Sequence, residues 1–201
     1  MLQLGRVAPF LEKVMDPPDP KAVQLSLQML RTLNAVDSEE RLTPIGFHLA
    51  KLPMDPQTGK MILMGALFSC VDPIFSIAAC LSFKDPFVVP LGKEIEVNRK
   101  KEFFSKGENS DHFIFSEAFR QWEKAESEGY GYKFAYDNYL SRHTLSLLKG
   151  MKGQFAQHLC EMNFLASSNP KDPRSNVNSK NTRLVKAIIC SGLYPNVAMI
   201  K

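Results

Sequence analysis

Residues 42–61, LTPIGFHLAKLPMDPQTGKM, contain two copies of one helix-starting device. Thr43-Pro44 and Asp55-Pro56 each place a side-chain oxygen at the N-cap position and a proline at the first helical position. Proline loses nothing there, because its missing N–H would have no helical partner and its fixed φ already suits a helix. Apolar residues then recur at helical spacing, so the stretch predicts two short helices joined by a tight turn.

The same device occurs once before this stretch and once after it, at Asp19-Pro20 and Asp72-Pro73. The first eighty residues are therefore expected to form a string of short helices. Between the first two, residues 34–42 are polar and are expected to form a small hairpin-like piece. Helices followed by such a wing are typical of a winged-helix module.

The rest of the chain predicts a helical bundle. Lys84–Asn109 is expected to be a loop and a short helix. A helix should then begin after residues 109–111 and stop at residues 129–131. A longer one should span about 137–163, with a buried stripe that excludes Arg142, Lys149 and Lys152. A polar loop over residues 167–182 and a helix over 184–190 should follow.

The predicted fold is therefore all-α, a winged helix followed by a ratchet-like helical bundle. The winged helix is assigned to residues 1–83, the connecting loop and short helix to 84–109, and the bundle to 110–192. Residues 193–201 are expected to begin a truncated OB-fold.

Composition limits the class of protein. The chain has 201 residues, a formal charge of +4 and four cysteines. None of the cysteines forms a CxxC pair and each lies in an apolar run, so buried free thiols and an intracellular location, in the cytoplasm or nucleus, are expected. Residues 61–83 are apolar, but Asp72-Pro73 divides them into two segments that suit buried helices, so no membrane span is expected.

Signs of catalysis are lacking. Gly59-Lys60 does not fit a phosphate-binding loop, since Met54 stands where the earlier glycine belongs and Met61 where serine or threonine would hold magnesium. The histidines show neither an HExxH pattern nor cysteine partners at zinc spacing. We therefore expect no catalytic residues, no metal site and no cofactor in this chain.

Two clusters of cations favour nucleic-acid binding. Arg99, Lys100, Lys101 and Lys106 flank Phe103 and Phe104, which are expected to be exposed. A second cluster lies in and beside the Asn/Ser-rich loop and includes Lys171 and Arg174. Cations with aromatic neighbours suit a single strand, because charge follows the phosphates and rings stack on bases. Solvated surface faces are the alternative for both clusters.

Three motifs carry a family resemblance. Residues 42–53, followed by Gly59-Lys60-Met61, resemble the "LTxLGxxLAxLPxxxxxGKM" signature of DEAH/RHA helicase accessory domains. Residues 110–112 ahead of Phe119-Arg-Gln-Trp122 are similar to that family's "SDHxxxxxxFxxW" helix. Residues 190–198 resemble the segment that enters its OB-fold. Residues 83–94 and 169–178 look closest to the RHAU-type branch, whose members resolve G-quadruplexes.

The resemblance implies a role beside a motor. In the family, the winged helix and bundle pack against two RecA-like motor domains, which hold ATP and magnesium, and single-stranded RNA passes between motors and bundle. The implied partners are single-stranded RNA or G-quadruplex nucleic acid, the motor domains and the OB-fold. The candidate RNA-binding residues are Ser110, Asp111, His112, Arg142, Lys149, Lys152, Lys171 and Arg174.

Two other functions remain open from the sequence. The region could be a protein–protein interaction scaffold without direct nucleic-acid contact. It could also bind duplex DNA through the winged helix, but the helix after Thr43 offers only His48 and Lys51 as recognition cations.

Overall fold

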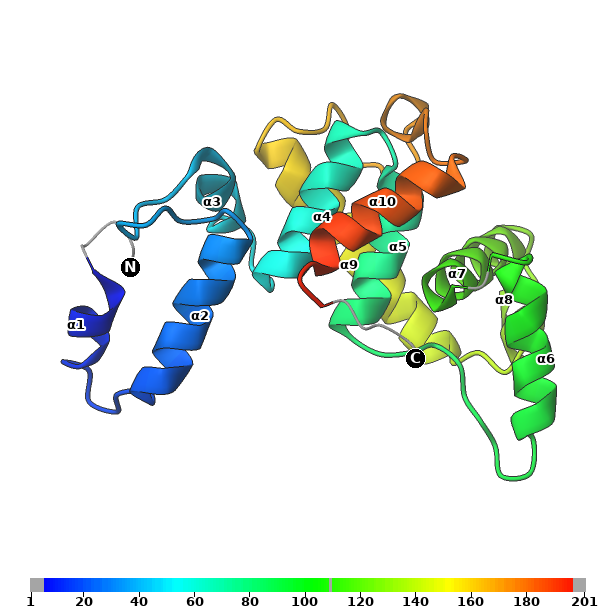
Figure 1. The fold of residues 1–201 in the computed structure, drawn as a ribbon. Coiled ribbons are helices and arrows are strands. Elements are labelled where there is room, and N and C mark those ends of the chain that lie inside the picture. Colours follow the sequence, from blue (N-terminus) through cyan, green and yellow to red (C-terminus); the bar gives the residue numbers. More distant parts are fainter. Residues whose placement is uncertain (1–5, 109, 197–201) are drawn as a thin grey trace. The chain divides into compact units, whose positions relative to one another are not determined.

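The computed structural model describes residues 6–108 and 110–196, and Figure 1 shows helices and no strand arrow in that part of the chain. The prediction of an all-α chain is thereby confirmed. The chain divides into two compact units. The first unit consists of the residues up to Met61 and those from Ile189 onward. The second unit is Ile62–Ile188.

The first unit contains α1 (Val7–Leu11), α2 (Pro20–Thr32) and α3 (Pro44–Leu49). Two predicted caps are confirmed there. The Asp19 carboxylate accepts a hydrogen bond from Lys21 N at 2.8 Å, and the Thr43 hydroxyl accepts one from Gly46 N at 3.1 Å. Proline follows each cap, so both helices start where their sequences predict.

The segment between α2 and α3 makes the predicted hairpin-like piece. Val36 and Leu42 form an isolated antiparallel bridge. The start of α3 then lies directly against the backbone of Ala35. A Cβ built on Gly46 would be 1.8 Å from the Ala35 carbonyl oxygen, so only glycine fits this contact.

Two helices take part in both units, because the division falls inside them. They are α4 (Pro56–Leu67) and α10 (Thr182–Leu193). The predicted cap of α4 is confirmed, since Asp55 Oδ1 accepts from Thr58 N at 2.9 Å. In the first unit, Gly192 lies so close to Met61 that an added Cβ would be 2.7 Å from the methionine Cβ.

The second unit also holds the helices of the bundle. These are α5 (Val71–Ser82), α6 (Glu94–Ser105), α7 (Asp111–Ser127), α8 (Gly131–Asp137), α9 (Arg142–Glu161) and the short 3₁₀ helix η2 (Pro173–Asn176). Helix α5 packs against both α7 and α9. Phe75 of α5 meets Phe155 of α9 edge to face, with ring centroids 5.9 Å apart, and Trp122 of α7 is fully buried. These large side chains are part of the core.

Several expectations need correction. Helix α5 begins at Val71, so Asp72-Pro73 lies inside its first turn and Asp72 does not cap it. The long helix predicted over about 137–163 is α9, which begins only at Arg142 because the chain turns at Tyr139 with a φ of 56°. The short helix α8 precedes this turn and was not predicted. Phe103 is exposed as expected, whereas Phe104 is buried. Residues 194–196 form no strand, and the remainder of the OB-fold expectation lies outside the described residues.

The cysteines only partly follow the expectation of buried thiols. Cys70 and Cys80 are buried and Cys160 is half-buried, but Cys190 is exposed on α10. Among the described residues, no helix is long and apolar enough to cross a membrane.

Candidate nucleic-acid interface

Helix α7 provides a wall of two pockets in the second unit. The smaller, of about 430 Å³, is lined by the C-terminal part of α7, by α9 and by the start of the Asn/Ser-rich loop. The larger, of about 640 Å³, is lined by the N-terminal part of α7 together with α5, α6, the same loop and the start of α10. Lys171 lines both pockets, so the loop connects them.

The smaller pocket brings together three of the predicted RNA-binding residues. Lys149 and Lys152 reach it from α9, and Lys171 reaches it from the loop. Lys149 is exposed, and Lys171 keeps 52% of its side chain exposed. Two cations from separate elements can thus meet a ligand at one opening, which is what a phosphate backbone needs.

Lys152 differs from the other two, because its side chain is buried and only 2% of the residue is exposed. Its Nζ donates a hydrogen bond to Asp72 Oδ1 at 2.7 Å and lies 3.6 Å from Glu123 Oε2. It also lies 4.6 Å from the centroid of the Phe119 ring. The prediction that Lys152 faces away from the buried stripe is therefore wrong. It forms part of the charged floor of the pocket.

The floor also contains Glu123, which the sequence did not indicate. Its Oε2 lies 3.0 Å from Lys171 Nζ, so this carboxylate faces one buried and one half-exposed lysine. Neither contact has hydrogen-bond geometry, and both are ion pairs. Two lysines and two acids, Glu123 and Asp72, thus balance one another, and the opening gains its positive charge from Lys149.

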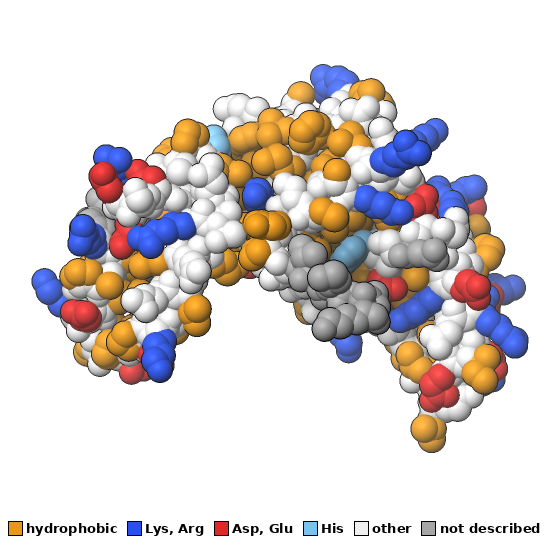
Figure 2. Space-filling model, viewed as in Figure 1, with side chains coloured by type: hydrophobic (Ala, Val, Ile, Leu, Met, Phe, Trp, Pro, Cys, Tyr) orange, Lys and Arg blue, Asp and Glu red, His pale blue; other side chains and the backbone are white. Residues whose placement is uncertain are grey.

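Both predicted arginines are engaged in ion pairs. Arg142, at the start of α9, lies 3.4 Å from Glu126. Arg174 Nη2 lies 2.8 Å from Asp172 Oδ2, and hydrogen bonds from Arg174 hold the pKa of Asp172 below its usual value. Figure 2 shows basic and acidic side chains interspersed on the visible face of the second unit. Such pairing leaves less free charge than the sequence suggests.

The Ser110-Asp111-His112 motif lies at the N-terminus of α7. Ser110 occupies the N-cap position but makes no side-chain capping hydrogen bond. Asp111 is twelve residues from Glu123 on the same helix, a rise of about 18 Å, so the motif is separate from the lysine opening. His112 Nδ1 is buried with no hydrogen-bond partner within residues 6–108 and 110–196, and burial lowers the pKa of His112.

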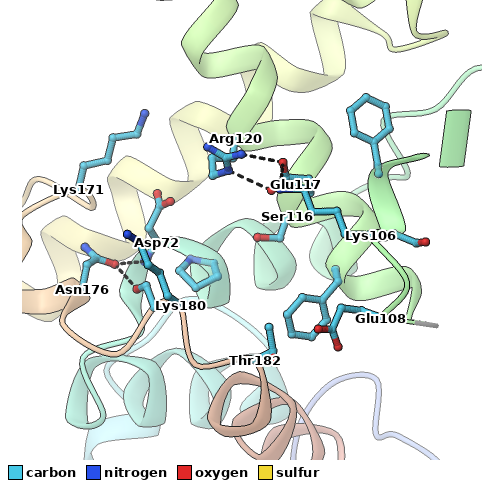
Figure 3. A pocket seen from close by; sticks show the side chains of 15 residues that line it. Asp72, Lys106, Glu108, Ser116, Glu117, Arg120, Lys171, Asn176, Lys180 and Thr182 are labelled. Carbon is cyan, nitrogen blue, oxygen red and sulfur yellow. Dashed lines mark hydrogen bonds and ion pairs between the residues drawn. The ribbon is translucent and has the colours of Figure 1, made fainter. Parts of the chain in front are cut away.

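Glu117 organises the cations of the larger pocket. Its carboxylate accepts hydrogen bonds from Arg120 at 2.7 and 3.0 Å and from Gln121 at 2.7 Å, and it pairs with Lys106 at 2.7 Å. Figure 3 shows Lys106, Glu117 and Arg120 on one wall of the pocket. Burial opposes ionisation of Glu117, but these donors outweigh it and lower the pKa to about 2.

Replacing Glu117 with glutamine should make the free energy of unfolding depend less on pH in the acid range. The folded pKa lies below the unfolded one, so the carboxylate stabilises the fold above about pH 4.5 and loses that effect as the pH falls towards about 2. We expect Glu117→Gln to cost roughly 1–2 kcal/mol at pH 7 and almost nothing near pH 2. Urea unfolding at both pH values measures this difference, and an equal loss at both would contradict it.

Within the described ranges, no group of three or more His, Cys, Asp and Glu side chains is placed to hold a metal ion. The site is therefore described by its cations, its paired acids and its two pockets.

Comparison with known proteins gives the class of this arrangement. The family described as the helicase associated domain (HA2), winged-helix, matches residues 26–54, and the ratchet-like helicase associated domain (HA2) matches residues 55–115. The two matches meet at residue 54, whereas the boundary expected from the sequence was residue 83. Residues 26–115 therefore belong to the winged-helix and ratchet-like helicase associated domains (HA2).

The relatives are large helicases. The chain is 52% identical over 203 residues to the ATP-dependent DNA/RNA helicase DHX36 of Bos taurus and of Homo sapiens. It is 38% identical over 200 residues to the DExH-box ATP-dependent RNA helicase DExH1 of Arabidopsis thaliana. Each alignment covers the whole chain but only 20% of the relative, so the chain spans about a fifth of the length of these proteins. The predicted family is confirmed.

Proposed function

We propose that this chain lines the path of a single nucleic-acid strand in an intracellular ATP-dependent helicase. The observation that carries the proposal is the opening of the smaller pocket, where Lys149 and Lys171 come together from α9 and the loop. The ion pairs of Lys152 hold α9 against α5 and α7, so the two exposed cations sit on a fixed frame.

The chemistry at this opening suits a backbone contact. Lysine ammonium groups meet phosphates as point charges and read no base, which fits a strand that moves past them. The relatives named DNA/RNA helicases make both strand types candidates, and G-quadruplex nucleic acid would be a substrate of the whole protein. ATP and magnesium would bind in motor domains outside this chain, and an OB-fold would be a further neighbour.

Binding of a labelled twelve-nucleotide oligouridylate should be weak and sensitive to salt. If Lys149 neutralises about one phosphate while Lys171 stays paired with Glu123, log Kd should change with log salt with a slope of about 0.7, or about 2.6-fold between 50 and 200 mM. Fluorescence anisotropy of the 201-residue chain measures both quantities.

Charge reversal at Lys149 should weaken this binding by about tenfold, since a repulsive group replaces a phosphate contact. The matched control is Lys133→Glu, which makes the same change at an exposed lysine of α8 outside both pockets. Equal losses in Lys149→Glu and Lys133→Glu would mean that net charge alone governs binding, and the proposed contact would be wrong.

A further inference from the structure

The larger pocket has polar groups that form no hydrogen bond or ion pair with any described residue. Ser116 of α7 and Thr182 of α10 both line it, and neither hydroxyl has a hydrogen-bond partner anywhere in the described part of the chain. Lys180 lines it as well and makes no ion pair with any described residue. Unused donors and acceptors that converge on one cavity are the usual sign of a ligand site.

The charge of this pocket favours an anion. Each acid that lines it already has a cation: Glu117 has Lys106 and Arg120, Glu108 has Lys186 at 2.7 Å, and Asp72 has Lys152 at 2.7 Å. On the loop wall, Lys171 pairs with Glu123, and Lys180 has no ion pair with residues 6–108 or 110–196. An anionic group of a ligand would therefore meet an unpaired ammonium without meeting an unpaired carboxylate.

Hydrogen bonds attach the loop that carries Lys180 to helix α5. Asn176 Oδ1 accepts hydrogen bonds from Asp72 N at 2.8 Å and from Ser179 Oγ at 2.7 Å. The amide nitrogen of Asn176 donates to the carbonyl oxygens of Pro170 and Asp172 at 2.7 and 2.9 Å. Figure 3 shows Asn176 and Lys180 across the pocket from Glu117 and Lys106. The loop wall is thus fixed to α5, and the pocket is preformed.

The pocket also has an apolar side. Phe113 of α7 and Pro73 of α5 line it. Lys186 Nζ, which pairs with Glu108, lies 5.6 Å from the centroid of the Phe113 ring. An aromatic ring beside free hydroxyls and an unpaired lysine suits a ligand with a flat ring at one end and an anion at the other.

We propose that the larger pocket binds a single nucleotide, with the base against Phe113 and the phosphate at Lys180. Its volume of about 640 Å³ lies within the range of small-molecule sites. The hydroxyls of Ser116 and Thr182 then bond to the sugar or the base edge. The nucleotide is either free or a residue of a bound strand. This site does not depend on the proposed strand contact, which uses the other pocket.

Titration of the 201-residue chain with adenosine monophosphate, followed by amide NMR shifts, tests the proposal. We expect AMP to bind at least about fivefold more tightly than adenosine, which lacks the phosphate, and than ribose 5-phosphate, which lacks the base. Lys180→Ala should weaken AMP binding by about fivefold or more, whereas Lys133→Ala should leave it unchanged. Lys149→Glu should also leave it unchanged, which separates this site from the proposed strand contact.

A twelve-nucleotide oligoadenylate distinguishes the two sources of the nucleotide. If Lys180→Ala weakens its binding too, the pocket takes a residue of a strand. If only AMP binding is weakened, it takes a free nucleotide. The proposal is overturned if inorganic phosphate binds as tightly as AMP, if Lys133→Ala acts like Lys180→Ala, or if AMP fails to bind at millimolar concentration. It is also overturned if a hexaglutamate peptide binds more tightly than AMP, since the pocket would then recognise acidic side chains.

Discussion

Replacing Lys152 with methionine is expected to lower the free energy of unfolding by about 3–5 kcal/mol. The lysine is 2% exposed, and it is the cation shared by Asp72 and Glu123. Methionine fills most of its volume but leaves two largely buried acids without that partner. The loss therefore comes from stranded negative charge, and the cation contact with the Phe119 ring adds to it.

The control for this change lies one turn away on the same helix. Lys149→Met removes an exposed lysine without an ion pair among the described residues and should change stability by less than about 0.5 kcal/mol. Adding Asp72→Asn and Glu123→Gln to Lys152→Met should recover part of the loss, because the stranded charges disappear. Urea unfolding monitored by circular dichroism measures all of these chains. Similar stabilities for Lys152→Met and Lys149→Met would contradict the buried network.

Replacing Gly46 with alanine should destabilise the first unit by about 3 kcal/mol or more. The added methyl group would be 1.8 Å from the Ala35 carbonyl oxygen, and this neighbour is backbone that cannot rotate away. The same carbonyl accepts a hydrogen bond from Thr43 N at 3.1 Å, so moving it also disturbs the start of α3. Amide hydrogen exchange in α2 and α3 reports this unit separately from the other.

Gly150→Ala is the matched control. A Cβ at Gly150 meets nothing within 4 Å, and the residue lies inside α9. Alanine should therefore stabilise that helix by about 1 kcal/mol, since it reduces the entropy lost on folding. If both changes shifted stability in the same direction, the close contact between α3 and Ala35 would not be as described.

Much of the fold follows from local sequence. Helix starts were predictable where the side chain before the proline accepts the capping hydrogen bond, as at Asp19, Thr43 and Asp55. The same pattern failed at Asp72, because this carboxylate binds Lys152, which lies 80 residues further along the chain. Helix α8 was not predicted, because residues 129–131 indicate the end of α7 and the next helical pattern begins only at about residue 137.

The candidate site was predictable only in part. Lys149 and Lys171 were selected from their charge, and the structure places them at one pocket. The burial of Lys152 could not be foreseen, because its periodicity on α9 suggests an outer face and its partners belong to α5 and α7. The free groups of the larger pocket are ordinary serine, threonine and lysine residues. They become notable only once five elements of the fold surround one cavity.

The first unit is discontinuous in sequence, which has a consequence for synthesis. Its last part begins at Ile189. Gln57 Nε2 donates a hydrogen bond to Leu193 O, 3.2 Å away, and this bond can form only after the whole of Ile62–Ile188 has been synthesised. A ribosome delivers chains from the N-terminus and most domains fold in that order. Of these two units, the second is therefore the first whose residues have all been synthesised, and the first unit is completed only when the end of α10 follows.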